Sequence, residues 1–159
     1  MTARPRSASF TEMVQVVLPN DANPLGFLLG GTAMHLIDIA GAIAAHRHTR
    51  SLLVTAAVDG LQFLHPIKVG DLIILKASVT AAFDTSLEVE VEVFSEGTLT
   101  GERKLTSRAF LTFVTVDKSG GRVPVPPLLL ETARDREVAR EAAVRREARL
   151  EAKRRFAQS

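Results

Sequence analysis

Residues 31–47 read GTAMHLIDIAGAIAAHR, and this stretch decides the fold. It contains no helix breaker except Gly41 and is rich in Ala, Leu, Ile and Met. Apolar residues lie almost all around the expected helix, which is typical of a helix that other structure covers on most sides. We therefore expect a central helix from Gly31 to about Arg47, preceded by a loop over residues 20–30.

The sequence around this helix alternates with a period of two. Residues 87–93 read LEVEVEV, which places Leu and Val on one face and Glu on the other. Such alternation is typical of a strand in an antiparallel sheet with one face toward water. We expect strands over Thr11–Leu18, Leu52–Leu64, Asp71–Phe83, Ser86–Ser95 and Lys104–Val116.

About five strands and one central helix indicate an α+β fold. A curved antiparallel sheet wrapped around the helix would bury the apolar faces of both. Three prolines between residues 124 and 127 end the sheet region, and Thr132 with Asp135 resembles a capping box at the start of a last helix. We expect one domain over residues 1–130 and a charged C-terminal helix within residues 131–159.

The positive charge is concentrated in this C-terminal segment. Residues 131–159 hold nine Lys or Arg and six Asp or Glu, whereas residues 1–130 hold eleven and twelve. We interpret the C-terminal helix as a solvated, salt-bridged element that lies on the body or on a partner subunit. Contact of its arginines with phosphate or RNA is a second interpretation. The near-neutral body argues against a general nucleic-acid binder.

The composition also excludes several kinds of functional site and indicates where in the cell the protein is located. The chain has no cysteine, which excludes disulfides, thiolate metal sites and cysteine nucleophiles. The four histidines show no metal spacing with carboxylates. No apolar segment follows the N-terminal arginines, so we expect no signal peptide and a cytoplasmic location. Pro24–Ala45 is long enough to span a membrane, but Asp38 near its middle favours a core helix and no membrane association.

Asp38 is the first candidate for chemistry, because its neighbours on the helix are apolar and shield it from water. A shielded carboxylate is costly unless it is hydrogen-bonded to backbone or to His35, or serves as a base. Asp38 stands seven positions after Gly31, on nearly the same helix face. The amides at the helix start are unpaired, and Gly30 and Gly31 have no side chains to block them, so they could stabilise a developing oxyanion. Together with the carboxylate of Asp38 on the same helix face, they indicate an acyl-transfer site.

Other candidates carry weaker signals. Asn23 lies in the loop before the helix and is a turn residue by itself. The serines lack a nucleophile elbow, and neither a phosphate-binding loop nor a dinucleotide fingerprint is present.

Several segments together resemble the cytosolic, brain-type acyl-CoA thioesterase family. They occur in the family's order, and the resemblance covers roughly residues 11–135. The segments are LPNDANPLGFLLGG at 18–31, MHLIDIAG at 34–41, TAAVD at 55–59, PIKVGD at 66–71, TSLEV at 85–89 and VPVPP at 123–127.

The resemblance implies a hotdog fold, a dimer with two sites at its interface, and often a trimer of dimers, hence a hexamer. It implies hydrolysis of fatty acyl-CoA to free acid and coenzyme A. No separate cofactor is implied, since coenzyme A is part of the substrate and product. The catalytic positions would be Asn23 and Asp38, acting together from different protomers, and the glycine pair that polarises the thioester carbonyl, Gly30 with Gly31.

The resemblance also implies where coenzyme A binds. Thr85 and Ser86 match a segment near coenzyme A, and His65 stands where the family often has Arg or Lys. Asp84 replaces a basic residue that commonly precedes the Thr-Ser pair. These two differences reduce the positive charge available to bind the phosphates of coenzyme A.

Two alternative functions remain open from the sequence. An enoyl-thioester hydratase or dehydratase of the same fold would use a catalytic histidine, and His35 on the central helix is the candidate for it. A non-catalytic acyl-CoA-binding protein would keep the pocket without the chemistry.

Overall fold

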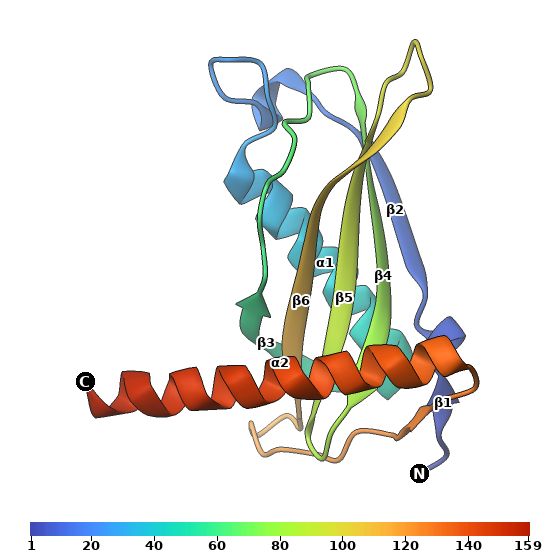
Figure 1. The fold of residues 1–159 in the computed structure, drawn as a ribbon, viewed down its shortest axis with the longest axis vertical. Coiled ribbons are helices and arrows are strands. Elements are labelled where there is room, and N and C mark those ends of the chain that lie inside the picture. Colours follow the sequence, from blue (N-terminus) through green and yellow to red (C-terminus); the bar gives the residue numbers. More distant parts are fainter.

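A five-stranded antiparallel sheet forms the body of the protein in the computed structural model, which describes residues 1–159. The strand order is β2-β4-β5-β6-β3. Their bounds are Thr11–Val16 for β2, Leu52–Asp59 for β3, Leu72–Ala82 for β4, Ser86–Glu96 for β5 and Arg103–Val116 for β6. The long helix α1, Gly30–Thr49, lies against the concave face of this sheet (Figure 1). The predicted α+β architecture is confirmed.

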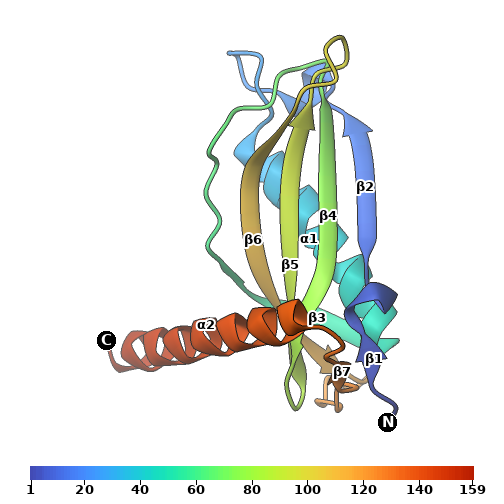
Figure 2. The same ribbon diagram turned by 45° about the vertical axis from the view of Figure 1, so that its right-hand side comes forward.

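Four shorter elements and one further helix complete the chain. A second helix, α2 (Ala133–Gln158), crosses the outer face of the sheet almost at right angles to the strands and extends past one edge (Figure 2). The shorter elements are β1 (Arg4–Pro5), which pairs with β7 (Leu128–Leu129), and the turns of 3₁₀ helix η1 (Arg6–Ala8) and η2 (Pro19–Asp21). The predicted cap of α2 is confirmed, because the Thr132 hydroxyl accepts a hydrogen bond from the Asp135 amide.

The core lies between α1 and the inner face of the sheet. Helix α1 buries a stripe of residues three and four positions apart, including Ala33, Ile37, Ala40 and Ala44. The alternating residues of β5 face this stripe, and Leu87, Val89, Val91 and Val93 are at most 1% exposed. The far side of α1 is less covered than the sequence indicated, since Met34 is 48% exposed.

Strand β3 is shorter than predicted and irregular. It ends at Asp59, because Gly60 has a φ of +68° and turns the chain, so residues 60–64 do not continue the strand. Its pairing with β6 shifts register between Thr55 and Ala57, which marks a β-bulge at Ala56. Its other edge is unpaired, and Val54 and Val58 on this strand are 52% and 44% exposed.

The outer face of the sheet differs from the prediction. Glu88 belongs to the LEVEVEV face that was expected to be open to water, but it is fully buried. Helix α2 covers it and supplies Arg145 as its partner. The alternation correctly assigned the residues to two faces, but it carries no information about what covers each face.

Candidate active site

Backbone amides that a ligand can reach lie at the start of α1, as predicted. The helix begins at Gly30, one residue earlier than expected, and its first amides have no partner of their own within the helix. A Cβ atom at Gly31 would meet nothing within 4 Å, and one at Gly30 would meet only the ring of Phe63, at 3.6 Å. A ligand carbonyl can therefore approach these amides closely, where the helix dipole also favours negative charge.

Gly31 and Asp38 line the same cavity, which has a volume of about 330 Å³. The helical spacing therefore brings together the two groups that it was predicted to bring together. Asp38 is half-buried in the single chain, less shielded than expected. His35 also lines this cavity, but it does not hydrogen-bond to Asp38.

Thr55 is the partner of Asp38, and sequence reasoning assigned it no role. Its hydroxyl donates a hydrogen bond to Asp38 Oδ1 at 2.7 Å. Strand β3 aims Thr55 toward α1, because Thr55 pairs with Phe113, a fully buried residue of the inner face. The sequence did contain a signal for this residue, because Thr55 belongs to TAAVD, one of the segments that carried the family resemblance.

Asn23 lies in a different cavity of the single chain. Its Oδ1 accepts hydrogen bonds from the amides of Leu25 and Phe27, at 3.0 and 3.2 Å, which fixes the loop before α1. Asn23 lines a second cavity of about 330 Å³ together with Gly30 and His65. One chain alone therefore does not bring Asn23 to Asp38.

The three predicted contacts to coenzyme A are also separated. His65 is exposed and lies beside the cavity that contains Asn23. Thr85 and Ser86 lie at the β4–β5 turn, where they line a groove of about 700 Å³ under α2. A single chain thus has its predicted ligand contacts on separate surfaces.

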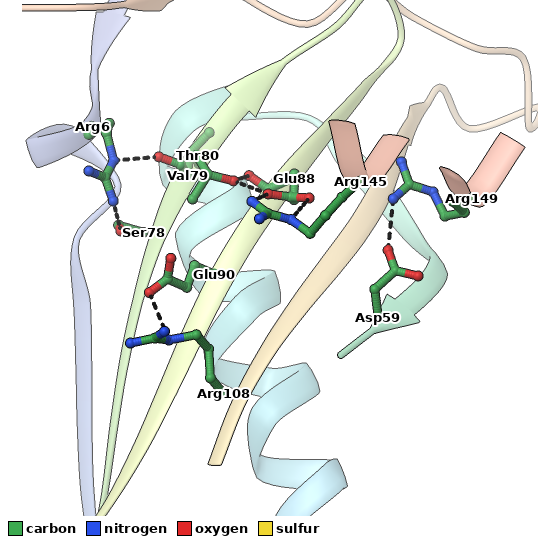
Figure 3. Close-up of polar contacts among 10 residues, drawn as sticks. All are labelled: Arg6, Asp59, Ser78, Val79, Thr80, Glu88, Glu90, Arg108, Arg145 and Arg149. Atoms are coloured by element: carbon green, nitrogen blue, oxygen red, sulfur yellow. Dashed lines mark hydrogen bonds and ion pairs between the residues drawn. The ribbon is translucent and has the colours of Figure 1, made fainter. Parts of the chain in front are cut away.

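The outer face carries a set of ion pairs that the sequence did not predict (Figure 3). Arg145 binds Glu88 through Nε–Oε2 at 3.0 Å and Nη2–Oε1 at 2.7 Å, and its guanidinium lies 3.6 Å from the centre of the Phe110 ring. Arg149 binds Asp59 Oδ2 at 2.7 Å. These bonds fasten α2 across the outer face of the sheet.

Burial shifts the pKa values of two ionisable groups of the body, Glu90 and His48. Burial, with Glu92 nearby, raises the pKa of Glu90, although Arg108 opposes this shift. Burial lowers the pKa of His48, with a contribution from Arg4, while the bond to the Pro126 carbonyl opposes it.

No group of three or more His, Asp or Glu side chains is arranged to hold a metal ion. Neither helix is both long and apolar enough to cross a membrane.

Comparison with known proteins identifies the family of this chain. The model of the thioesterase superfamily matches residues 25–102. An uncharacterized acyl-CoA thioester hydrolase of Bacillus subtilis is 44% identical over 116 residues, which are 73% of this chain and 67% of that protein. The chain belongs to the thioesterase superfamily. The human cytosolic acyl coenzyme A thioester hydrolase is 32% identical over 136 residues, and there the match covers 83% of this chain but only 36% of that protein.

Solved structures of superfamily members share the whole hotdog fold. An apo hexameric acyl-CoA thioesterase superposes with a TM-score of 0.91 at 39% identity, covering 96% of this chain and 97% of that one. An acyl-CoA hydrolase of Staphylococcus aureus in complex with butyryl coenzyme A and coenzyme A gives 0.87 at 31% identity, covering 98% and 94%.

The Staphylococcus aureus hydrolase has also been crystallised with an asparagine, an aspartate or a threonine replaced by alanine. The asparagine and aspartate are separated by 15 residues and the aspartate and threonine by 17. Asn23, Asp38 and Thr55 have the same two separations in this chain.

Proposed function

We propose that this protein hydrolyses acyl-CoA thioesters to free fatty acid and coenzyme A, at sites completed between two copies of the chain. The observation that carries the proposal is the cavity shared by Gly31 and Asp38, with Thr55 bonded to the carboxylate. A thioester carbonyl at the start of α1 would accept hydrogen bonds from the helix amides. A carboxylate on the same helix face would be within reach of the carbonyl carbon.

The roles follow from the chemistry of each group. The Gly31 amide would stabilise the oxyanion of the tetrahedral intermediate. Asp38 would take a proton from the attacking water, and that proton would then leave with the coenzyme A thiolate. Attack by Asp38 itself is the alternative route, and it would form an acyl anhydride that water then hydrolyses. Neither route requires a cofactor.

Thr55 would act as a positioning residue, because its hydroxyl occupies Asp38 Oδ1 and leaves Oδ2 for the reaction. Asn23 would orient the water or the thioester through its amide nitrogen, since its Oδ1 is used within the loop. The variants crystallised in the Staphylococcus aureus protein support this set of three residues.

The proposed site needs two copies of the chain, because Asn23 and Asp38 lie in different cavities of a single chain. The free edge of β3 exposes Leu52, Val54 and Val58, and an unpaired apolar edge is a template for a second strand. Pairing of β3 with its copy would extend the sheet and bring one chain's loop toward the other's α1. The hexameric relative supports a trimer of such dimers.

The remaining sequence predictions fit this proposal. All the residues proposed for the reaction lie within residues 1–130, which we propose as the thioesterase domain, with residues 131–159 as an added helix. A cytoplasmic location stays a prediction. The hydratase alternative depends on His35, which lines the same cavity, and His35→Ala would remove hydration of enoyl thioesters if that alternative held.

The test is coenzyme A release from acyl-CoAs of increasing chain length, followed with a thiol reagent. We expect turnover by the wild type and a loss of at least about a hundredfold in Asp38→Asn, the size typical of a lost proton acceptor. Asp117→Asn, an exposed carboxylate outside the cavity, is the matched control and should keep its turnover. Normal turnover by Asp38→Asn would overturn the role of Asp38.

Co-expression tests the shared site separately. Asn23→Ala and Asp38→Asn should each be inactive alone, whereas a mixed dimer should regain one of its two sites, because that site holds both intact residues. Random pairing makes about half of the dimers mixed, so the co-expressed protein should regain roughly a quarter of the wild-type sites. No recovery, with mixed dimers demonstrated by two affinity tags, would place both residues in one chain's site.

A further inference from the structure

The ion pair between Arg149 and Asp59 joins α2 to the edge strand that carries Thr55. Arg149 Nη1 lies 2.7 Å from Asp59 Oδ2, and the two side chains are 17% and 30% exposed (Figure 3). Asp59 is the last residue of β3, and Thr55 lies on the same strand four residues earlier. The proposed reaction uses Thr55 on the inner face of the sheet but gives no role to the ion pair on the outer face.

The β-bulge places these two contacts on opposite faces of the sheet. In a regular strand, residues four positions apart face the same side. The extra residue at Ala56 shifts this alternation, so Thr55 faces α1 whereas Asp59 faces α2. The same shift keeps Val58 on the inner face, where it lines the Asp38 cavity beside Thr55. The ion pair and the contact with the Asp38 carboxylate therefore act on the single segment 55–59.

Little else within the chain holds this segment in place. Strand β3 lies at the edge of the sheet and pairs only with β6. Its register with β6 shifts directly after Thr55, and the positive φ of Gly60 turns the chain directly after Asp59. A bulge disrupts the ladder of hydrogen bonds locally. The bond from Arg149 to Asp59 is therefore an important restraint on the position of this segment.

Helix α2 is itself fixed to the sheet one turn before Arg149. Arg145 makes two hydrogen bonds to the fully buried Glu88 of β5, and it packs on the ring of Phe110 in β6. Residues four positions apart lie on the same face of a helix, so Arg145 and Arg149 both face the sheet. Phe110 is also the residue of β6 that pairs with Asp59. Arg149 thus ties the end of β3 to a helix that is already anchored on β5 and β6.

We propose that Arg149 is a positioning residue for the hydrolysis and that it acts through Asp59 and β3 on Thr55. The inference rests on the proposed function, in which the Thr55 hydroxyl holds the Asp38 carboxylate through its hydrogen bond of 2.7 Å. Without the ion pair, the end of β3 can move, and Thr55 no longer fixes the direction of the carboxylate. A displacement of about 1 Å at a reacting group can cost about a hundredfold in rate.

The proposal places the effect of Arg149 on kcat. Arg149 also lines the groove under α2, where a direct contact with the substrate would instead change KM. The test therefore measures kcat and KM for acyl-CoA hydrolysis separately in the wild type and in variants of α2.

Three single variants separate positioning from stability. Arg149→Ala removes the bond to Asp59, whereas Arg149→Lys keeps a positively charged N–H donor for the single bond that the structure shows. Arg145→Ala is the control for stability alone. It exposes a more deeply buried carboxylate than Asp59 to the loss of its partner, but it leaves the Asp59 bond in place. Urea unfolding and size-exclusion chromatography show that each variant is folded and assembled.

We expect Arg149→Ala to lower kcat about tenfold with less than a twofold change in KM, and Arg149→Lys to keep most of the wild-type kcat. Arg145→Ala should lose more stability than Arg149→Ala but less than about twofold in kcat. A larger fall in kcat in Arg145→Ala than in Arg149→Ala would overturn the proposal, because stability alone would then explain both. A change confined to KM would also overturn it, because Arg149 would then contact the substrate.

A second background tests the route through Thr55. In Thr55→Ala, the added Arg149→Ala should lower kcat by less than about twofold, because the contact through which it acts is already missing. The same tenfold loss in this background as in the wild type would overturn the proposed route.

Amide hydrogen exchange of residues 52–59 follows the strand independently of the reaction. Exchange should be faster in Arg149→Ala than in the wild type and in Arg145→Ala, and unchanged exchange would contradict the proposal. If the wild type hydrolyses no acyl-CoA, the proposed function fails, and the exchange measurement still decides whether the ion pair holds β3.

Discussion

Removal of the Arg145 side chain would leave a buried carboxylate without its charged partner. Glu88 is fully buried, and in Arg145→Ala it keeps only the hydrogen bond from the Thr80 hydroxyl, at 2.6 Å. Breaking a buried ion pair by removing one partner costs about 3–5 kcal/mol. The Arg145 side chain remains 23% exposed, so water already weakens the pair, and we expect a loss of about 3 kcal/mol in the free energy of unfolding.

The assay is urea unfolding at one fixed protein concentration, because assembly contributes to stability. A loss of this size corresponds to a fall in Tm of roughly 6–12 °C for a domain of this length. Arg140→Ala, on the same helix and without an ion pair, should change stability by less than about 0.5 kcal/mol.

A double variant separates the unpaired charge from lost packing. Glu88→Gln/Arg145→Met removes both charges, keeps an acceptor for Thr80 and keeps an apolar stem over Phe110, so it should regain most of the lost stability. The reasoning is refuted if Arg145→Ala is no less stable than Arg140→Ala, or if the double variant is as unstable as Arg145→Ala.

Two further predictions concern pH. Burial, with Arg4, lowers the pKa of His48 below its ordinary 6.5, so the unfolded chain takes up the proton first and stability is lost as the pH falls below about 6.5. His48→Asn should flatten this slope between pH 7 and pH 5, measured by urea unfolding, and an unchanged slope would contradict the assignment. Burial, with Glu92, raises the pKa of Glu90, so its contribution to stability is present below pH 4.5 and is lost as the pH rises through the raised value. Glu90→Gln should therefore be more stable than the wild type at pH 7 but equal to it near pH 4, and a gain that is the same at both values would count against burial as the cause.

The sequence predicted most of the fold because the pattern within each element is local. The LEVEVEV alternation and the apolar stretch at 31–47 each determine which residues share a face. The predicted end of β3, at Leu64, was wrong, because residues 60–64 are also largely apolar and continue the pattern of the strand. The strand ends at Asp59 because Gly60 has a positive φ and turns the chain. The cover over Glu88 was missed because it comes from Arg145, 57 residues later.

The site was predictable only where its parts lie on one element. Gly31 and Asp38 share a cavity because seven residues are nearly two helical turns. Thr55 comes from a strand, and its contact with Asp38 depends on how that strand packs on α1. Asn23 and Asp38 line different cavities of the folded chain, and the number of residues between them does not predict this.

The bulge in β3 gives neighbouring residues separate tasks. Thr55 faces the carboxylate proposed to do the chemistry, whereas Ala56 lines the groove under α2. A substitution at one position alters one surface and leaves the other untouched, although the two codons are adjacent in the gene. The Asp38 cavity and the groove under α2 can therefore change through separate substitutions within a single edge strand.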